Sequence, residues 1–259
     1  MSEPTIMVCR DDAVVTVTLN RPEKRNALDL ATWRRLGDAM ENLADQQEVR
    51  CVVLQGAGGH FAGGADISAF AAERVTPEQV RTYAEAEHRG VMAVYGCPHP
   101  TVASVAGACA GGGLEIALAC DIRVAASSAR FGAPINRLGL TMSHEELRLF
   151  MQRVGPSAAL ELLLEGTMVD AQRAREMGIV NRVVPDSELA DQTAATSRRI
   201  VEGAPLVNRW HKKLVRRLTD FTPLSQAEVA EGYAAFETED YQIGYRAFLD
   251  KRKPDFRGR

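Results

Sequence analysis

Cysteine is scarce in this chain, and its pattern excludes a disulfide framework. Five cysteines occur among 259 residues, and no two of them form a Cys-x-x-Cys pair. Most of them lie in apolar stretches, where an unpaired thiol behaves as a small apolar side chain. An odd number without paired spacing is not typical of a disulfide-stabilised secreted domain. We therefore expect reduced cysteines in the core of a cytoplasmic protein, and no metal ion.

Long apolar runs and a strong excess of charge are also missing. No run approaches the roughly 18 apolar residues that cross a membrane, and the first residues lack the basic-then-apolar order of a signal peptide. The chain holds 31 Lys and Arg against 34 Asp and Glu, a net charge of −3. This balance gives no general attraction to nucleic acid or to an anionic membrane. We expect neither as a partner.

One basic cluster follows Pro205, and two apolar residues, Trp210 and Leu214, interrupt it. The spacing predicts an amphipathic helix whose basic face is solvated and whose apolar residues turn inward or towards a subunit contact. The alternative, a nucleic-acid-binding face, finds no support in the acidic total or in any binding motif. The basic residues of this cluster are Arg209, Lys212, Lys213, Arg216 and Arg217.

Apolar patterning predicts strands that alternate with helices. Two runs rich in β-branched residues, 5–9 and 13–19, flank a polar turn and predict a hairpin. The alternation that follows is typical of an α/β domain with parallel strand pairing. Helices are predicted over 28–45, 77–95, the stretch after Gly113, 157–164 and 170–177, and strands over 51–54, 101–105, 121–125 and 179–184.

Beyond Pro185 the pattern changes to helices alone. Prolines at 205 and 223 interrupt these predicted helices. The change predicts two parts, a core over residues 1–203 and a C-terminal helical region over residues 204–259.

Two glycine-rich turns are the most informative local feature. The first is Phe61-Ala62-Gly63-Gly64-Ala65-Asp66-Ile67, and the second runs from Gly107 through Gly111-Gly112-Gly113-Leu114-Glu115. Glycine leaves backbone N–H groups open to a ligand, and a helix start favours an anion. Facing each other, the turns would form a two-donor pocket for a developing oxyanion, with a carboxyl group beside it.

These turns resemble motifs of the crotonase (enoyl-CoA hydratase/isomerase) superfamily. The first resembles its F-x-x-G-x-D-[IL] turn, and the second resembles its G-G-G-x-E-L helix start, with Cys120-Asp121 at the helix end. Three further stretches agree in order and spacing: Leu19 to Leu28, Met177 to Val184, and Glu239 to Phe256. The resemblance covers essentially the whole chain.

The resemblance implies a fold, an assembly and a chemistry. The fold is α/β, a crotonase-like spiral of ββα units with a C-terminal helical trimerisation region, and the assembly is a homotrimer or hexamer. The substrate is an acyl-CoA thioester, with no cofactor besides the coenzyme A that belongs to the substrate. The backbone N–H groups of Ala65 and Gly112 would hold the thioester oxygen, and Glu115 would act as general acid or base. Because Glu115 interrupts an otherwise apolar stretch, burial should raise its pKa.

One position departs from the family pattern. Hydratases and many isomerases of the family carry a second glutamate directly after a proline, and here Pro134 is followed by Ile135, which cannot move a proton. Two alternatives remain open. His144, Glu145 or Glu146 supplies the missing acid or base, or a single carboxyl group acts alone. For Glu145 and Glu146 the competing interpretation is a helix start, because Ser143 and Glu146 have the spacing of a capping box.

Because Ile135 replaces the second glutamate, other functions remain open. They are decarboxylation, thioester hydrolysis or dehalogenation with the same oxyanion pocket, or acyl-CoA binding by a scaffold without catalytic activity. Family analogy places coenzyme A along the two turns, with phosphate contacts from basic residues. The residues expected to bind it are Lys24, Arg25, Ala62, Gly63, Asp66 and Ile67, together with Phe248 and Lys251 from the tail of the same or a neighbouring subunit.

Overall fold

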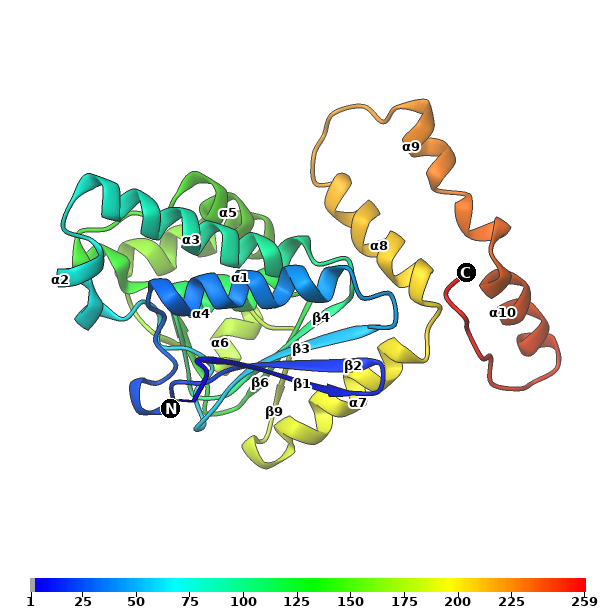
Figure 1. The fold of residues 1–259 in the computed structure, drawn as a ribbon, viewed down its shortest axis with the longest axis horizontal. Coiled ribbons are helices and arrows are strands. Elements are labelled where there is room, and N and C mark those ends of the chain that lie inside the picture. Colours follow the sequence, from blue (N-terminus) through cyan, green and yellow to red (C-terminus); the bar gives the residue numbers. More distant parts are fainter. Residues whose placement is uncertain (1–2) are drawn as a thin grey trace.

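A six-stranded sheet forms the centre of the computed structural model, which describes residues 3–259 (Figure 1). β1 and β2 form the predicted antiparallel hairpin, and every later neighbour pair is parallel, as the alternating pattern predicts. In spatial order the strands are β1 (Ile6–Asp11), β2 (Val14–Leu19), β3 (Cys51–Gly56), β4 (Thr101–Val105), β6 (Ile122–Ala126) and β9 (Arg182–Val184). β9 is shorter than the predicted 179–184 strand.

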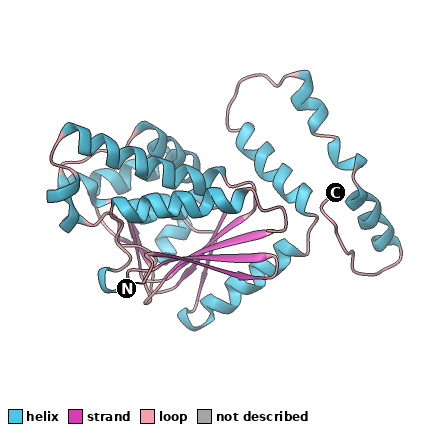
Figure 2. Ribbon diagram, viewed as in Figure 1, coloured by secondary structure: helices cyan, strands magenta, loops and turns pink. Residues whose placement is uncertain are grey.

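Helices cover both faces of this sheet (Figures 1 and 2). α1 (Leu30–Ala44) and α3 (Pro77–Gly96) pack together on one face, and α7 (Leu189–Val201) packs against β3, β4 and β6 on the other. Among residues 3–259, none of the helices combines the length and apolar character needed to cross a membrane. The remaining helices before the tail are α2 (Phe70–Glu73), α4 (Gly112–Ala119), α5 (His144–Glu165) and α6 (Ala171–Glu176).

The central strands supply side chains to two cores. Val52 and Leu54 of β3 join the core beneath α1 and α3, whereas Cys51 and Val53 face α7 and its Leu189. Successive side chains of a strand point to opposite faces, so a strand buried on both sides reads as a continuous apolar run. This is why residues 51–54 could be recognised as a strand from the sequence.

A second, three-stranded sheet lies beside the first and was not predicted. Its order is β5-β7-β8, with β5 and β7 parallel and β7 and β8 antiparallel. The strands are two or three residues long, too short to show the period-2 pattern by which strands are recognised. They are β5 (Ala108–Ala110), β7 (Arg130–Gly132) and β8 (Val169–Asp170).

Trp33 of α1 fixes how α3 and α4 approach α1. Its side chain is fully buried, and its indole Nε1 donates a hydrogen bond to the Tyr83 hydroxyl at 3.1 Å. Glycines face the ring from both helices. A Cβ at Gly90 of α3 would lie 2.8 Å from the ring, and one at Gly112 of α4 would lie 2.7 Å from it. The helices come this close because both positions lack a side chain.

Only helices follow Pro185, as the sequence predicts, and the last of them lie away from the sheet (Figure 1). α7 ends at Val201 and α8 begins at Pro205. The division into a core and a C-terminal helical region stays a prediction. The tail consists of α8 (Pro205–Arg217), α9 (Gln226–Glu231) and α10 (Glu239–Leu249).

The basic face of α8 is not simply solvated, which corrects the sequence-based interpretation for one residue. Lys212 is buried, and its Nζ lies 2.6 Å from an Asp121 carboxylate oxygen and 2.7 Å from the His99 carbonyl oxygen. Arg216 reaches the same aspartate at 3.2 Å. A buried ammonium is tolerated when it is paired. Part of the basic cluster therefore joins α8 to the loop ahead of β6.

Gly90→Ala should destabilise the fold. The added Cβ meets the fully buried Trp33 ring, which has no free space to move into, and overpacking of this kind costs about 1–3 kcal/mol. Gly96→Ala, in the same helix, is the matched control because nothing lies within 4 Å of its Cβ position. Urea unfolding of both variants measures the difference. Equal stability of the two would contradict the close packing of α3 on Trp33.

Candidate active site

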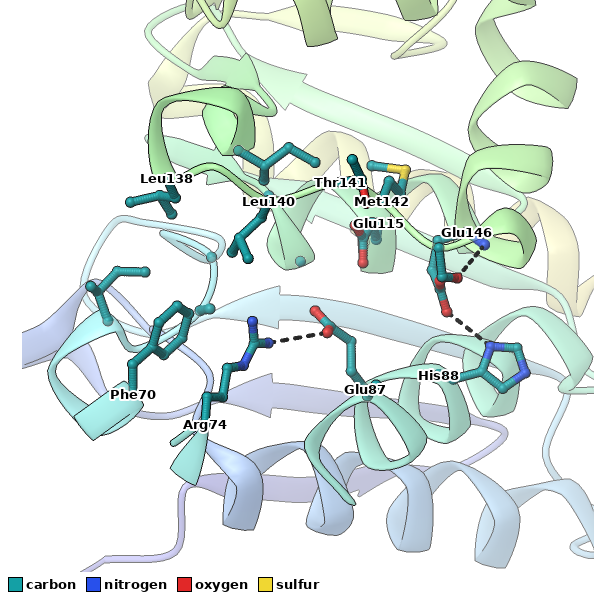
Figure 3. Close-up of a pocket in the computed structure, with 18 of the residues that line it drawn as sticks. Phe70, Arg74, Glu87, His88, Glu115, Leu138, Leu140, Thr141, Met142 and Glu146 are labelled. Carbon is teal, nitrogen blue, oxygen red and sulfur yellow. Dashed lines mark hydrogen bonds and ion pairs between the residues drawn. The ribbon is translucent and has the colours of Figure 1, made fainter. Parts of the chain in front are cut away.

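A cavity of about 800 Å³ opens where the two glycine-rich turns meet α3 and the segment leading into α5 (Figure 3). Residues 63–65 of the first turn and 110–112 of the second form part of its wall. Most residues of the segment 134–146 cover it from another side, and α3 supplies the side chains between Val80 and His88 that face it. A pocket of this size can enclose a ligand of drug-like dimensions.

The first turn leaves one backbone N–H group open. Leu28 bonds to both neighbours of Ala65, because its N–H donates to the Gly64 carbonyl and its carbonyl accepts from the Asp66 N–H, both at 2.8 Å. Alternation along an extended chain directs the Ala65 N–H away from Leu28. It has no backbone acceptor within the described residues 3–259. An amide in this state is available to a ligand.

The second turn opens α4. Gly111 has φ +48°, a conformation that favours glycine, and its N–H donates to the Gly132 carbonyl at 2.9 Å. Gly112 is the first residue of the helix, so its N–H has no intrahelical acceptor and lies at the positive end of the helix dipole. Both Ala65 and Gly112 line the cavity.

Glu115 lies one turn into α4 and lines the same cavity. Only 8% of the residue is exposed, and its Oε2 is buried without a hydrogen-bond partner among residues 3–259. Burial, reinforced by the charges of Glu87 and Glu146, raises the pKa of Glu115 well above its ordinary value. The carboxyl group therefore keeps its proton to a higher pH than a free glutamate does, and its Oε2 is free to interact with a ligand.

Glu87 of α3 is a second cavity carboxyl group that the sequence analysis missed. Burial raises its pKa to about 7, although the nearby guanidinium of Arg74 acts to lower it. A terminal guanidinium nitrogen of Arg74 lies 3.3 Å from the Glu87 Oε2. A signal was present in the sequence, because Val80, Tyr83, Glu87 and Val91 follow helical spacing and place this glutamate on the apolar face of α3.

Glu146 is the third buried carboxyl group at the cavity. Its Oε1 lies 2.8 Å from Nδ1 of His88, and the residue is 6% exposed. The expected helix start is confirmed, since the Ser143 side chain accepts from the Glu146 N–H. The full capping box is wrong, because the Glu146 carboxylate binds His88 instead of reaching back to residue 143. Within residues 3–259, no group of three or more His, Cys, Asp and Glu is arranged to hold a metal ion.

The structure brings some of the predicted site residues together and separates others. Gly63, Ala65, Ile67, Gly112, Glu115 and Glu145 line the cavity, as does Ile135. The residues that lie off its wall are His144, Lys24, Arg25, Ala62, Asp66, Phe248 and Lys251. His144 is exposed at the start of α5, and Phe248 is 82% exposed in α10.

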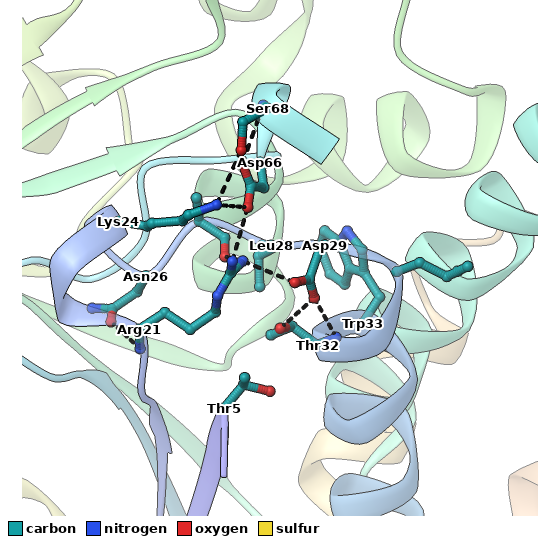
Figure 4. A network of polar contacts seen from close by, with 12 residues as sticks. Thr5, Arg21, Lys24, Asn26, Leu28, Asp29, Thr32, Trp33, Asp66 and Ser68 are labelled. Atoms are coloured by element: carbon teal, nitrogen blue, oxygen red, sulfur yellow. Dashed lines mark hydrogen bonds and ion pairs between the residues drawn. The ribbon is translucent and has the colours of Figure 1, made fainter. Parts of the chain in front are cut away.

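Asp66 holds the first turn in place through ion pairs (Figure 4). Arg21 and Lys24 each approach its Oδ2 at 2.8 Å, and Ser68 donates to its other oxygen. Burial acts to raise the pKa of Asp66, but the hydrogen bonds from Lys24, Ser68 and Arg21 outweigh it and hold the pKa well below its usual range. Asp66 and Lys24 therefore bind each other in this structure, and both stiffen the loop that carries Ala65.

Comparison with known proteins gives consistent matches over the whole chain. The family model "Enoyl-CoA hydratase/isomerase" matches residues 10–259. The chain is 30% identical to the crotonyl-CoA hydratase of Syntrophomonas wolfei and 32% identical to the carnitinyl-CoA dehydratase of Salmonella agona, with 99% and 100% of both partners covered. The crystal structure of an enoyl-CoA hydratase/carnithine racemase from Magnetospirillum magneticum has a TM-score of 0.97 and 45% identity to this chain, and the alignment covers 100% of this chain and 97% of that one.

Glu115→Gln should stabilise the folded protein as the pH rises. Burial raises the pKa of Glu115 above the 4.5 of a free side chain, so its contribution to stability is complete below that pH and is lost as the pH rises through the folded-state pKa. Glutamine does not ionise, so the variant should gain on the wild type from about pH 4.5 upward. Urea unfolding across pH measures the gap, with the exposed Glu78→Gln as control. A gap that does not change with pH would contradict the burial of this carboxyl group.

Proposed function

The chain belongs to the enoyl-CoA hydratase/isomerase family, and from this premise we propose that it catalyses the reversible hydration of an enoyl-CoA thioester. The cavity would bind the acyl thioester, the amides of Ala65 and Gly112 would hold its oxygen, and Glu115 would transfer a proton. The crotonase fold of the chain, with structural neighbours above a TM-score of 0.9, supports this proposal.

One observation carries the proposal: the buried Oε2 of Glu115 has no partner in residues 3–259 and lies on the cavity wall. An unpaired buried carboxyl oxygen costs free energy in the folded state, so its position calls for an explanation. A carboxyl group with a raised pKa can give and take a proton near neutral pH. Perturbed carboxyl groups in clefts concentrate at active sites.

The two free amides would stabilise the enolate intermediate of the proposed reaction. Adding water to the β carbon of an enoyl thioester places negative charge on the thioester oxygen. Two N–H groups held by the backbone stabilise that charge without reorganising, and removing one such donor typically costs about 2.7–4 kcal/mol of transition-state stabilisation. Ala65 and Gly112 supply backbone donors, which only a substitution by proline at those positions would delete directly.

Coenzyme A would follow the first turn out of the cavity. Gly63 and Ile67 line the wall there. Lys24 is the last residue of the η1 turn (Pro22–Lys24), and Arg25 follows it as the C-cap. Lys24 is partly exposed at the Asp66 ion pair, where its ammonium is close to any phosphate that approaches. Phe248 and Lys251 would contact coenzyme A bound to a neighbouring subunit. The cytoplasmic location stays a prediction.

Glu115→Gln should abolish most of the hydratase activity. Loss of an acid/base group typically lowers the rate by about 10²–10⁴-fold, and glutamine keeps the shape of the side chain. Loss of the conjugated-thioester absorbance on hydration of crotonyl-CoA and longer enoyl-CoA substrates measures kcat. Glu78→Gln, on the exposed face of α3, is the control and should retain wild-type activity.

Three results would separate this proposal from its rivals. No turnover of any enoyl-CoA by the wild type would contradict a hydratase. Tight acyl-CoA binding without turnover of any thioester would favour a silent scaffold, which Ile135 on the cavity wall keeps open. Wild-type activity in Glu115→Gln would contradict the role of that carboxyl group.

We also propose that the tail assembles the chain into a trimer or hexamer. The tail carries large apolar side chains in water, which is unusual for a protein that stays monomeric. The aromatic rings of Phe236 and Tyr241 pack on each other at a centroid distance of 5.1 Å, yet both remain exposed. Strongly exposed members of this surface include Phe221, Tyr233, Phe236, Phe248 and Leu249.

Phe236→Asp should weaken this assembly, because a charge cannot be buried between subunits without a partner. Light scattering coupled to size exclusion should give three or six chain masses for the wild type and a smaller mass for the variant. Phe236→Tyr keeps the ring and serves as the control. A wild-type protein that remains monomeric at micromolar concentration would contradict the proposal.

A further inference from the structure

We infer that Glu87 is the second acid/base residue of this cavity, sharing one proton with Glu115 while Arg74 holds the negative charge on Glu87. The inference rests on the proposed hydratase function and deepens it. It replaces the sequence-based candidates for this role: Glu145 is exposed, His144 lies off the cavity wall, and Glu146 is paired with His88. It also explains how the site can carry Ile135 and still move two protons.

The geometry places Glu87 opposite the reactive wall. Its Oε1 lies 3.5 Å from the position that a Cβ on Gly112 would occupy, so the carboxylate faces the start of α4. Glu115 projects into the same space from the first turn of that helix, and Figure 3 shows the two carboxyl groups pointing into the cavity from opposite walls. A substrate held at Gly112 would therefore lie between an acid and a base.

Arg74 is fixed so that its charge reaches Glu87. Its guanidinium carbon stacks 3.7 Å from the centre of the Tyr83 ring and 4.3 Å from that of Phe70. Guanidinium groups bind well to aromatic faces. One terminal nitrogen then lies 3.3 Å from the Glu87 Oε2. The side chain is mostly buried, so solvent screens this pair only weakly.

The surrounding charges favour an unequal pair. Arg74 stabilises negative charge on Glu87, and the charge of Glu87 in turn raises the pKa of Glu115. Glu146, bound to His88, adds negative charge that acts on both. The other charged groups on the cavity wall are Arg81, Glu85, Arg137 and Glu145. Like charges this close do not ionise together, so Glu87 carries the charge and Glu115 keeps the proton.

This division gives a balanced reaction. Ionised Glu87 accepts a proton from water, and the water oxygen forms a bond to the β carbon of the enoyl thioester. The electron pair of the double bond moves to the thioester oxygen at Ala65 and Gly112. Glu115 then donates its proton to the α carbon, which completes the addition of one water. Transfer of the proton from Glu87 to Glu115 restores the starting state.

Glu87→Gln should lower kcat for crotonyl-CoA hydration by about 100-fold or more. The wild-type kcat/KM should rise with pH through about 7, where Glu87 ionises, and the variant should lose this rise. The variant should still exchange the α protons of butyryl-CoA with D2O, because Glu115 serves that carbon and, without the charge of Glu87, ionises more readily and can accept an α proton. Glu115→Gln should lose the exchange.

Two further variants keep the test decisive if the glutamine variant folds poorly. Glu87→Asp keeps the carboxyl group and should retain partial activity with the same rise in pH. Arg74→Met removes the charge that lowers the pKa of Glu87, so the rise should move to higher pH. The exposed Glu78→Gln, on the same helix, controls for loss of an acidic group, and thermal unfolding checks that each variant is folded.

The outcomes distinguish this inference from the function on which it rests. Folded Glu87→Gln with activity within about threefold of the wild type, beside an inactive Glu115→Gln, would overturn the role of Glu87 and leave the hydratase intact. An unchanged pH profile in Glu87→Gln would reduce Glu87 to a structural ion-pair partner and also overturn it. Loss of α-proton exchange in that variant would overturn the assignment of the α carbon to Glu115. A wild type without hydratase activity would overturn the function itself.

Discussion

The close approach of two backbone turns is the constraint on which the site depends. A Cβ at Gly113 would lie 2.5 Å from the Ala62 carbonyl oxygen, and one at Gly112 would lie 2.7 Å from Trp33. Gly64 has φ +98° and its Cβ position is 3.0 Å from the Ala110 carbonyl oxygen. These positions are glycine because a side chain there would clash with the neighbouring turn or with Trp33. The same lack of side chains leaves the backbone amides of the site uncovered. Backbone that must approach this closely leaves N–H groups exposed where no side chain covers them.

The same packing makes the buried carboxyl groups costly. α4 is buried along its whole length, so a glutamate in its first turn has no route to solvent other than the cavity. Its unpartnered oxygen and raised pKa are penalties that the folded state carries. Stability is commonly sacrificed at sites that need a group in a particular protonation state. Burial of Glu115 costs free energy of folding, and the same burial raises its pKa, so the carboxyl group keeps a proton beside the two amides.

How far the sequence could predict this molecule depends on whether a feature is local. The hairpin, the alternation of strands and helices, the glycine turns and Glu115 on an apolar helix all show within short windows, because periodicity and turn chemistry are local. The partners of charged side chains are not local. Lys212 pairs with Asp121, and Glu87 with Arg74, through the three-dimensional packing alone. For this reason the sequence analysis predicted a solvated Lys212 and did not identify Glu87 as a site residue.

The contrast between backbone and side chain explains how Ile135 can stand where the family pattern has an acid. The oxyanion donors are amides held by a fixed backbone geometry, so they tolerate change in the residues around them. An acid or base needs only a carboxyl group within reach of the substrate and a pKa near neutral, and a cavity has several walls that can supply one. Here α3 offers Glu87 with its Arg74 partner. The fold thus determines which intermediate is stabilised, because it fixes the two amides. The wall of the cavity that supplies the acid or base can differ between members of the family.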